Sequence, residues 1–351
     1  MANKKPSGKV TLFDVAKRAG VSHTAVSMAL RGSPEVGARQ AEKIRALAAK
    51  LGYYPKAAAQ MLRAGRTGYL GIVMAGSSQD VIAETGFGGL ILAHFLGHCQ
   101  ARSIRNSIEF FQPAPDGGFS PPHSLSGGLV DGVVLAGFVD AGLRQWLSTQ
   151  TRFPWVSIDE PGPYSVLCAS DLGVAEAVRR LALAGHRRIG FWGGPTEFST
   201  HRLEMEGFKR GVVEAGMDTG GGRWVKTFDP LDLTSGNHAI NYSEWSRSLL
   251  NDSPRPTAVV CHGPSAAREF ILTAARMGLD VPADLSVYCF CSAADAVLGT
   301  PPLSSIEADM SSIVGEAISM LSALTGSEKC APKSVWFPPR VVDRESVAPL
   351  R

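Results

Sequence analysis

The chain has 351 residues, of which 44% are hydrophobic and 19% charged, with 38 glycines. This composition excludes a peptide-sized scaffold and a disordered chain, and it predicts two to three structural units with cores of their own. The net charge of +3 is unevenly distributed: residues 1–66 hold thirteen Lys and Arg against three acids, a charge of +10, which leaves −7 for the other 285 residues. A small basic head on a larger acidic body indicates that the head meets a polyanion.

The N-terminal stretch MANKKPSGKV is charged but is followed by no long apolar run, so we expect no secretory signal and a cytoplasmic protein. No apolar run approaches the ~18–20 residues that span a bilayer, and no membrane partner is expected. The six cysteines form no C-x-x-C pair, which favours free thiols. For Cys289 and Cys291, core packing is favoured over a metal site because no His or Cys lies at ligand spacing, and no cofactor is expected.

Residues 11–32 predict two short helices joined by a tight turn. Thr11 is expected to cap the first helix, with Asp14 at its third position as a shortened capping box. Gly20 ends this helix where a positive φ is needed. Ser22 then caps a second helix over residues 23–30, which Arg31-Gly32 closes.

The spacing Ala16…Gly20…Val26 is typical of a DNA-binding helix-turn-helix, because it combines a close helix crossing, a tight turn and a locked second helix. Helical pairs with this turn also occur in other proteins, but the basic excess favours DNA. A third amphipathic helix is expected at Ala38–Lys50. Residues 56–63 contain strong helix formers but are too few for a helix that is stable alone in water.

From residue 69 onward, apolar strand-like runs alternate with helical stretches. The expected strands are Leu70–Met74, Ser107–Phe111, Gly132–Ala136, Trp155–Ile158, Ile189–Trp192, Ala258–Cys261 and Leu285–Phe290. The expected helices are Gly173–Ala184, Arg202–Ala215, Ser265–Met277 and Ser311–Leu324. Continuous apolar runs separated by helices predict parallel strands covered on both faces, and ligands of such sheets bind at the carboxyl ends of strands. Pro113–Gly128 is expected to be a long surface connection.

Several motifs occur in a familiar order along the chain. They are Thr11-Leu-Phe-Asp-Val-Ala-Lys-Arg-Ala-Gly-Val-Ser22, Gly52-Tyr-Tyr-Pro55, Ala57-Ala-Ala59, Leu62-Arg63, Val130-Asp-Gly132, Gly185-His-Arg-Arg-Ile189, Pro256-Thr-Ala258, Val281-Pro282, Leu285-Ser-Val287, Thr300-Pro-Pro-Leu303 and Arg344-Glu-Ser346. In these motifs the chain resembles the LacI/GalR family of bacterial transcription regulators, from about residue 9 to residue 346.

The resemblance implies an N-terminal all-α helix-turn-helix DNA-binding domain followed by an α/β two-lobed, periplasmic-binding-protein-like (type I) domain for effector binding and dimerisation. The expected boundaries are 1–52 for the DNA-binding headpiece, 53–68 for a hinge helix and linker, and 69–346 for the body. Within the body we expect lobe 1 at about 69–160 and 293–325, and lobe 2 at about 163–290 and 328–346.

The resemblance also implies a homodimer with each second helix in a major groove of double-stranded DNA. It places base-reading side chains at His23, Thr24 and Met28. The further expected DNA contacts are Thr11, Ser22, Ser27, Arg31, Lys56, Leu62 and Arg63, among which Leu62 is the leucine that wedges into a base step. Met28 departs from the family, which usually has an arginine there that can grip guanine, so either it contacts thymine methyl groups or it only fills space.

For the effector, the resemblance points to Arg202, which matches the family's effector-gripping arginine, and to the end of the strand before Asp159. The expected effector-binding residues are Asp159, Trp192, Arg202, His262 and Cys291, with Phe198 and His201 as further candidates. The polar residues usual at three strand ends are replaced by Ala136, Gly263-Pro264 and Cys291. Because sugars need fixed polar partners, we expect either a less hydroxylated ligand or a vestigial pocket.

The predicted function is that of a sequence-specific transcriptional repressor that binds a pseudo-palindromic operator as a dimer, with a small molecule between the lobes modulating its affinity. The alternative is a DNA-binding regulator whose vestigial pocket takes no effector. A solute-binding transport protein is disfavoured by the helix-turn-helix. An enzyme is also disfavoured, because the chain contains no P-loop and no G-x-S-x-G elbow.

Overall fold

The structure is a computed structural model that describes residues 10–54, 66–75, 87–111, 119–137, 141–150, 153–227, 238–326 and 331–350. The chain divides into two compact units, Met1–Thr67 and Gly68–Arg351. The expected hinge helix at 56–63 lies outside the described residues. No described helix has the length and apolar character to cross a membrane.

The head consists of three helices: α1 (Leu12–Ala19), α2 (His23–Arg31) and α3 (Ala38–Lys50). The predicted capping box of α1 is present, with the Thr11 amide donating to Asp14 Oδ2 over 2.9 Å and the Asp14 amide donating to Thr11 Oγ1 over 3.3 Å. Ser22 Oγ accepts the Ala25 amide at 3.1 Å and caps α2. The core of the head is made of small and branched side chains: Val15, Ala16, Val26, Ala29, Ala41, Ile44 and Ala48.

The turn between α1 and α2 depends on Gly20, which adopts φ +65° at the C-cap of α1. A Cβ added there would meet no atom within 4 Å, so the cost of a side chain is that of the left-handed backbone alone. We expect Gly20→Ala to lower the free energy of unfolding of the head by about 1–2 kcal/mol. Gly20→Asn should cost less, because asparagine tolerates this region. Thermal unfolding of the two variants checks the order, and equal losses would contradict it.

The body contains two six-stranded sheets. In the first the strand order is β11-β5-β4-β3-β1-β2, and in the second it is β12-β10-β9-β8-β6-β7. All pairings are parallel except that of β10 with β12. The strands are β1 (Tyr69–Ala75), β2 (Arg105–Phe111), β3 (Gly132–Ala136), β4 (Trp155–Ile158), β5 (Tyr164–Cys168), β6 (Ile189–Gly193), β7 (Val225–Thr227), β8 (Ala258–His262), β9 (Ser286–Phe290), β10 (Ser304–Glu307), β11 (Lys333–Phe337) and β12 (Arg340–Val342).

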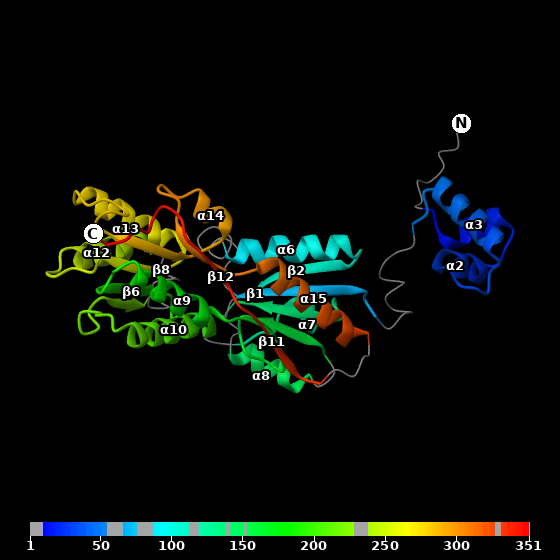
Figure 1. Ribbon diagram of the computed structural model, residues 1–351. Coiled ribbons are helices and arrows are strands. Elements are labelled where there is room, and N and C mark those ends of the chain that lie inside the picture. Colours follow the sequence, from blue (N-terminus) through cyan, green and yellow to red (C-terminus); the bar gives the residue numbers. More distant parts are fainter. Residues whose placement is uncertain are drawn as a thin grey trace, which may run out of the picture. The chain divides into compact units, whose positions relative to one another are not determined.

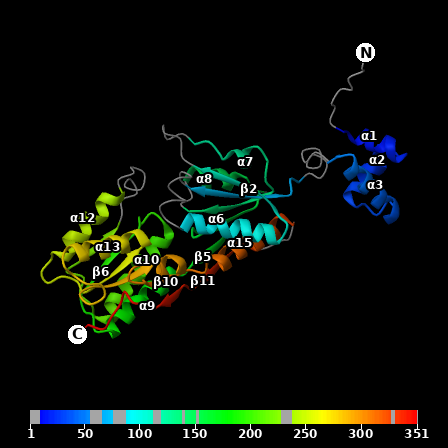
Figure 2. The same ribbon diagram turned by 90° about the horizontal axis from the view of Figure 1, so that it is seen from above.

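Helices cover both sheets, as the ribbon shows (Figure 1). The helices are α6 (Phe87–Ala101), α7 (His123–Ser126), α8 (Ala141–Thr149), α9 (Ser170–Leu183), α10 (Ser199–Ala215), α12 (His238–Leu250), α13 (Pro264–Arg276), α14 (Ala293–Val297) and α15 (Met310–Thr325). In the turned view α6 and α15 lie side by side over the first sheet (Figure 2). The arrangement is the predicted one, with parallel strands buried between helices.

The lobe boundaries differ from those expected. Residues 164–168 and 333–337 form β5 and β11 of the first sheet, not the second, and residues 304–307 form β10 of the second sheet, not the first. The Pro161-Gly162-Pro163 break therefore does not separate the lobes. These strands join the sheets in which their apolar side chains become buried. Val166 of β5 is fully buried beside β4 in the first sheet, and Ile306 of β10 is fully buried where it pairs with Phe290 in the second.

Two further expectations concern the connections and the cysteines. The stretch Pro113–Gly128 was expected to be surface, but it includes α7, in which Ser124 and Leu125 are buried. Glu109 at the end of β2 accepts the amides of His123 and Ser124, which holds this short helix in place. The five described cysteines are buried free thiols, as expected, and Cys289 and Cys291 lie in the core of the second lobe.

Hydrogen bonds of two motif residues, Ser346 and His186, tie the C-terminal segment to the second lobe. Ser346 is fully buried, and its hydroxyl donates to the Val287 carbonyl at 2.6 Å and accepts the Ser304 amide at 2.7 Å. His186 Nε2 lies 3.1 Å from the Ala348 carbonyl, to which it donates. The motifs around residues 186 and 346 are therefore explained by anchoring of the chain end.

Candidate DNA-binding and effector sites

The second helix of the head presents the predicted base-reading side chains on its outer surface. His23 and Thr24 are exposed at its first turn, whereas Met28 is half-buried one turn later. Val26 and Ala29, on the opposite face, are fully buried in the head. Burial of one face thus fixes which side chains are available to a groove of DNA.

The residues expected to contact phosphates differ in exposure and in the hydrogen bonds that they already make within the head. Ser22 is exposed, and since its oxygen accepts the Ala25 amide, its hydroxyl proton is available to a phosphate. Thr11 donates its hydroxyl to Asp14 Oδ2 over 2.7 Å, so it acts first as a cap. That hydrogen bond and the backbone one from Thr11 lower the pKa of Asp14. Arg31 is exposed and donates back to the Ser27 carbonyl at 3.1 Å, and Ser27 is half-buried.

Lys56, Leu62 and Arg63 lie outside the described residues, and their DNA contacts stay predictions. One residue that the sequence reasoning missed is Phe13, whose side chain is 68% exposed. Its ring centroid lies 5.3 Å from that of His23. A large aromatic residue outside the apolar stripe of α1 is the signal that could have identified it.

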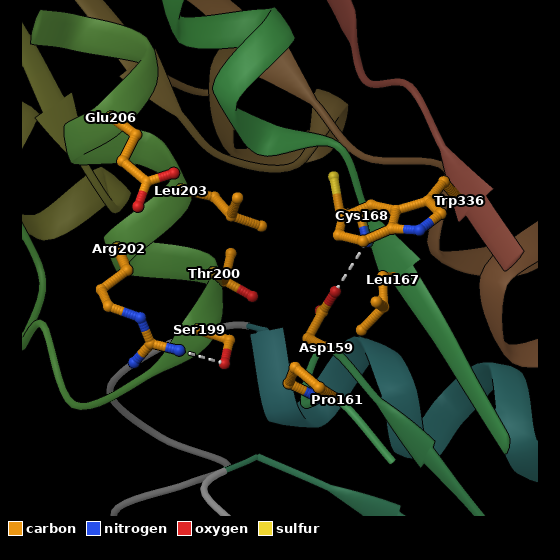
Figure 3. A pocket seen from close by; sticks show the side chains of 10 residues that line it. All are labelled: Asp159, Pro161, Leu167, Cys168, Ser199, Thr200, Arg202, Leu203, Glu206 and Trp336. Carbon is orange, nitrogen blue, oxygen red and sulfur yellow. Dashed lines mark hydrogen bonds between the residues drawn. The ribbon is translucent and has the colours of Figure 1, made fainter. Parts of the chain in front are cut away.

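In the body, a cavity of about 120 Å³ lies between elements of both lobes (Figure 3). One wall is formed by the first turns of α10, and the other by residues of β5, β11 and the loop after β4. Its lining residues are Asp159, Pro161, Leu167, Cys168, Ser199, Thr200, Arg202, Leu203, Glu206 and Trp336. Two of the five expected effector residues, Asp159 and Arg202, are thus brought together.

Asp159 is the buried acid of this cavity. It adopts φ +59° and is 7% exposed, and its Oδ1 accepts the Cys168 amide at 3.0 Å. Its Oδ2 is buried and has no hydrogen-bond partner among the described residues. Burial raises the pKa of Asp159 to about 7 despite that hydrogen bond, and the nearby acids Glu160 and Glu204 add to the shift.

Arg202 is exposed on α10, and its guanidinium is held by the loop that precedes this helix. One terminal nitrogen donates to the carbonyls of Thr196 and Glu197, each at 3.1 Å, and the other donates to Ser199 Oγ at 2.7 Å. Ser199 in turn donates its amide and hydroxyl to the buried Glu160. The predicted gripping arginine therefore stands at the cavity with much of its donor capacity already used.

His262 belongs to a hydrogen-bonded relay beside the cavity. His201 Nδ1 lies 3.0 Å from the Pro195 carbonyl and must donate to it, so His201 Nε2 accepts from His262 Nε2 at 3.1 Å. His262 Nδ1 then donates to Glu204 at 2.9 Å. Burial lowers the pKa of His262, but the Glu204 carboxylate outweighs burial and raises it, whereas burial and His262 hold the pKa of His201 well below its usual range.

The other two expected effector residues lie in the core. Trp192 is 1% exposed, with its ring 4.2 Å from that of Trp245 and 5.3 Å from that of Tyr242. Cys291 is buried in the same cluster, near Cys261 and Cys289. Neither lines the cavity, because the apolar face of β6 and the end of β9 turn toward α12 and α13. No group of three metal-binding side chains occurs in the part of the chain that the structure describes.

Comparison with known proteins accounts for both units. Residues 11–56 match the model of bacterial regulatory proteins of the lacI family, and residues 178–347 match that of the periplasmic binding protein-like domain. In both units the chain is thus similar to the LacI/GalR family of bacterial transcription regulators. It is a DNA-binding regulator of transcription with a helix-turn-helix head and a two-lobed α/β body.

Relatives of full length support this assignment. The HTH-type transcriptional repressor PurR of Proteus mirabilis is 28% identical over 344 residues, covering 96% of this chain and 97% of that protein. The PurR of Salmonella newport is 28% identical over 355 residues, with the same coverage. These family relatives are regulators rather than enzymes.

Solved structures share the fold. A lac repressor dimer bound to operator and the anti-inducer ONPF matches with a TM-score of 0.82 at 21% identity, covering 97% of this chain and all of that one. The transcriptional regulator CelR in complex with cellobiose matches with a TM-score of 0.69 at 23% identity, covering 96% of this chain and all of that one.

Proposed function

We propose that this LacI-family protein is a homodimeric repressor that acts in the cytoplasm on a pseudo-palindromic operator. The observation that carries the proposal is α2, which is capped and packed so that His23 and Thr24 are exposed side by side on a basic head. The names of the PurR relatives support repression. Exposed Val297 and Leu298, just before the Thr300-Pro-Pro-Leu303 motif, support dimer contacts made by the body.

Selection of duplexes from a random pool by the full-length protein tests this proposal. We expect enrichment of a pseudo-palindrome whose half-sites are related by the two-fold axis of the dimer and lie about one helical turn apart. The spacing follows because each subunit inserts one α2 into a major groove on the same side of the duplex. A pool that shows no enriched sequence after repeated rounds would refute sequence-specific binding.

Because Met28 stands where relatives have arginine, we expect the operator of this protein to differ in sequence from theirs. A methionine side chain offers only apolar contact, so the base pair opposite it should not be a guanine held by two hydrogen bonds. We expect Met28→Arg to shift the selected base at one symmetric position of each half-site toward guanine. Met28→Leu is the matched control and should leave the selected sequence unchanged. An unchanged selection for the arginine variant would show that this position does not face a base.

We further propose that a small molecule in the cavity modulates operator affinity. The cavity is bounded by α10 of the second lobe and by β5 of the first, so movement of one lobe against the other changes its shape. A ligand that binds one lobe arrangement more tightly shifts the population, with coupling energies of typically ~1–3 kcal/mol. Operator affinity measured with and without a bound ligand tests this gating, and equal affinities would favour a regulator without an effector.

A further inference from the structure

The charged side chains that line the cavity are two acids and one arginine, Arg202. Its walls are mostly apolar, and three of the side chains that form them are Leu167, Leu203 and Trp336. Its acids are Asp159, buried within it, and Glu206, exposed on α10. Because the guanidinium of Arg202 is already bonded to protein oxygens, the acidic groups are left facing hydrocarbon and one indole ring.

The polar groups around Asp159 are largely committed to protein partners. Glu160 is occupied by the amide and hydroxyl of Ser199, and Arg202 by two backbone carbonyls and the same hydroxyl. Glu204 is occupied by His262. Among these groups only Asp159 keeps a buried carboxyl oxygen with no hydrogen-bond partner in the part of the chain that is described.

A buried acceptor without a donor is costly, and a bound donor relieves the cost. The charge of the surroundings decides what kind of donor is favoured. Glu160 and Glu204 repel a second negative charge near Asp159, so a cation is favoured and a carboxylate ligand is opposed. A hydroxyl would satisfy the oxygen without relieving this repulsion.

Trp336 offers the second half of a cation site. It is 50% exposed, and it pairs in register with Leu167 of β5 next to the strand end at Cys168. The face of an indole attracts ammonium groups within about 6 Å of its centre. The carboxyl group of Asp159 and the indole ring of Trp336 line one small cavity. Together they form an arrangement that can recognise alkylammonium ions.

We propose that this cavity binds a small organic ammonium ion, with its N–H groups on Asp159 and its hydrocarbon body against Trp336 and the leucines. The proposal names the effector class and so rests on the proposed gating function. A cavity of about 120 Å³ is somewhat smaller than one of about 150 Å³ that takes benzene, which limits the enclosed part of the ligand to about five or six heavy atoms.

Binding is expected to depend on pH. The pKa of Asp159 is raised to about 7, so below this pH the carboxyl is protonated and lacks the charge that attracts an ammonium. Alkylammonium groups stay charged well above pH 8. Affinity should therefore rise between pH 6 and pH 8. The titratable and charged groups that face this carboxyl or line the cavity are Glu160, Cys168, Arg202, Glu204 and Glu206.

Three probes of nearly equal size test the charge preference: n-butylammonium, 1-butanol and butyrate. Each is titrated into the full-length protein without DNA, and binding is followed by ligand-observed NMR and thermal shift. We expect n-butylammonium to bind about tenfold or more tightly than 1-butanol, and butyrate not to bind. Equal binding of all three, preferred binding of butyrate, or Asp159-dependent binding of glucose with no response to n-butylammonium would overturn the proposal.

Variants locate the site. Asp159→Asn keeps the size of the side chain and tolerates the positive φ, and it should abolish the preference for the cation. Trp336→Leu, at an exposed position, should weaken n-butylammonium severalfold and 1-butanol little. Glu214→Gln is the matched control. It removes one exposed charge from α10, the helix that forms one wall of the cavity, at a position outside the cavity. An unchanged preference in both Asp159→Asn and Trp336→Leu would overturn the assignment, even if one of them folds poorly.

The same titrations separate this inference from the gating function. If n-butylammonium binds through Asp159 but leaves operator affinity unchanged, the ligand class stands and gating fails. If another compound changes operator affinity in wild type and in Asp159→Asn alike, gating stands and the ammonium site is refuted.

Discussion

Replacing Glu307 with alanine should lower the free energy of unfolding of the body by about 3–5 kcal/mol, because it leaves a largely buried cation without its partner. Glu307 is 6% exposed at the end of β10, and its Oε1 lies 2.6 Å from Arg344, whose side chain is only 16% exposed. Ser305 also donates to this carboxylate at 2.6 Å. Arg344 would keep its bond to the Leu303 carbonyl but lose its counter-charge. Urea unfolding of the purified variant measures the loss.

Arg340 supplies the matched control on the same carboxylate. It donates to Glu307 Oε2 at 2.8 Å, but its side chain is 74% exposed. Exposed ion pairs contribute about 0–1 kcal/mol, so Arg340→Ala should cost no more than that. A loss below about 1 kcal/mol for Glu307→Ala, or equal losses for the two variants, would show that burial of Arg344 does not set the energy of this cluster.

The double variant His23→Ala/Thr24→Ala should lose most of its preference for the selected operator. Each lost base contact is expected to cost about 1–3 kcal/mol, or about 5- to 150-fold in affinity. Both side chains are exposed on α2, so the fold of the head should be kept. Equilibrium binding to the operator and to a scrambled duplex measures the change, with circular dichroism as the check on folding.

The control for this variant removes charge instead of base contacts. Arg31 is exposed in the last turn of α2, and Arg31→Ala should weaken binding to both duplexes by a similar factor, because phosphate contacts carry no sequence information. The assignment of α2 as the base-reading helix would be wrong if the double variant lowered both affinities equally.

The head could be predicted closely from the sequence because its signals are local. The cap at Thr11, the positive φ of Gly20 and the cap at Ser22 each act within four residues, and all three occur where expected. The apolar stripe that ends at Val26 and Ala29 is also a local pattern. Phe13 was missed because a stripe predicts what is buried, not which exposed side chain lies beside His23.

The body could be predicted only in part. The runs that became β1, β3, β4, β6, β8 and β9 were recognisable, since strands covered on both faces are continuously hydrophobic. The edge strand β2, which is partly exposed, was recognisable from its apolar end at residues 107–111. Which of the two sheets a strand joins could not be predicted for β5, β10 and β11. These strands lie near the points where the chain crosses between the lobes, and their pairing partners decide their sheet. Pro161 and Gly162 interrupt the pattern without marking a boundary.

The cavity was the least predictable feature. Asp159 and Arg202 could be proposed from their places after a strand and in a helix, but Trp336 reaches the cavity from a strand more than 130 positions further along the chain. Trp192 was expected to contact the effector, yet its ring packs against Trp245 and Tyr242. Such outcomes depend on which face of a strand is turned inward, which the sequence of a fully buried strand does not encode.

The charge of +10 on residues 1–66 explains why the head binds any DNA duplex, but it does not explain selectivity for one sequence. The most direct test is the ratio of dissociation constants of the full-length protein for its selected operator and a scrambled duplex, at about 150 mM salt. Exposed base-reading side chains on α2 predict a ratio of about 10³ or more. A ratio near one, with binding that vanishes as salt is raised, would contradict the account.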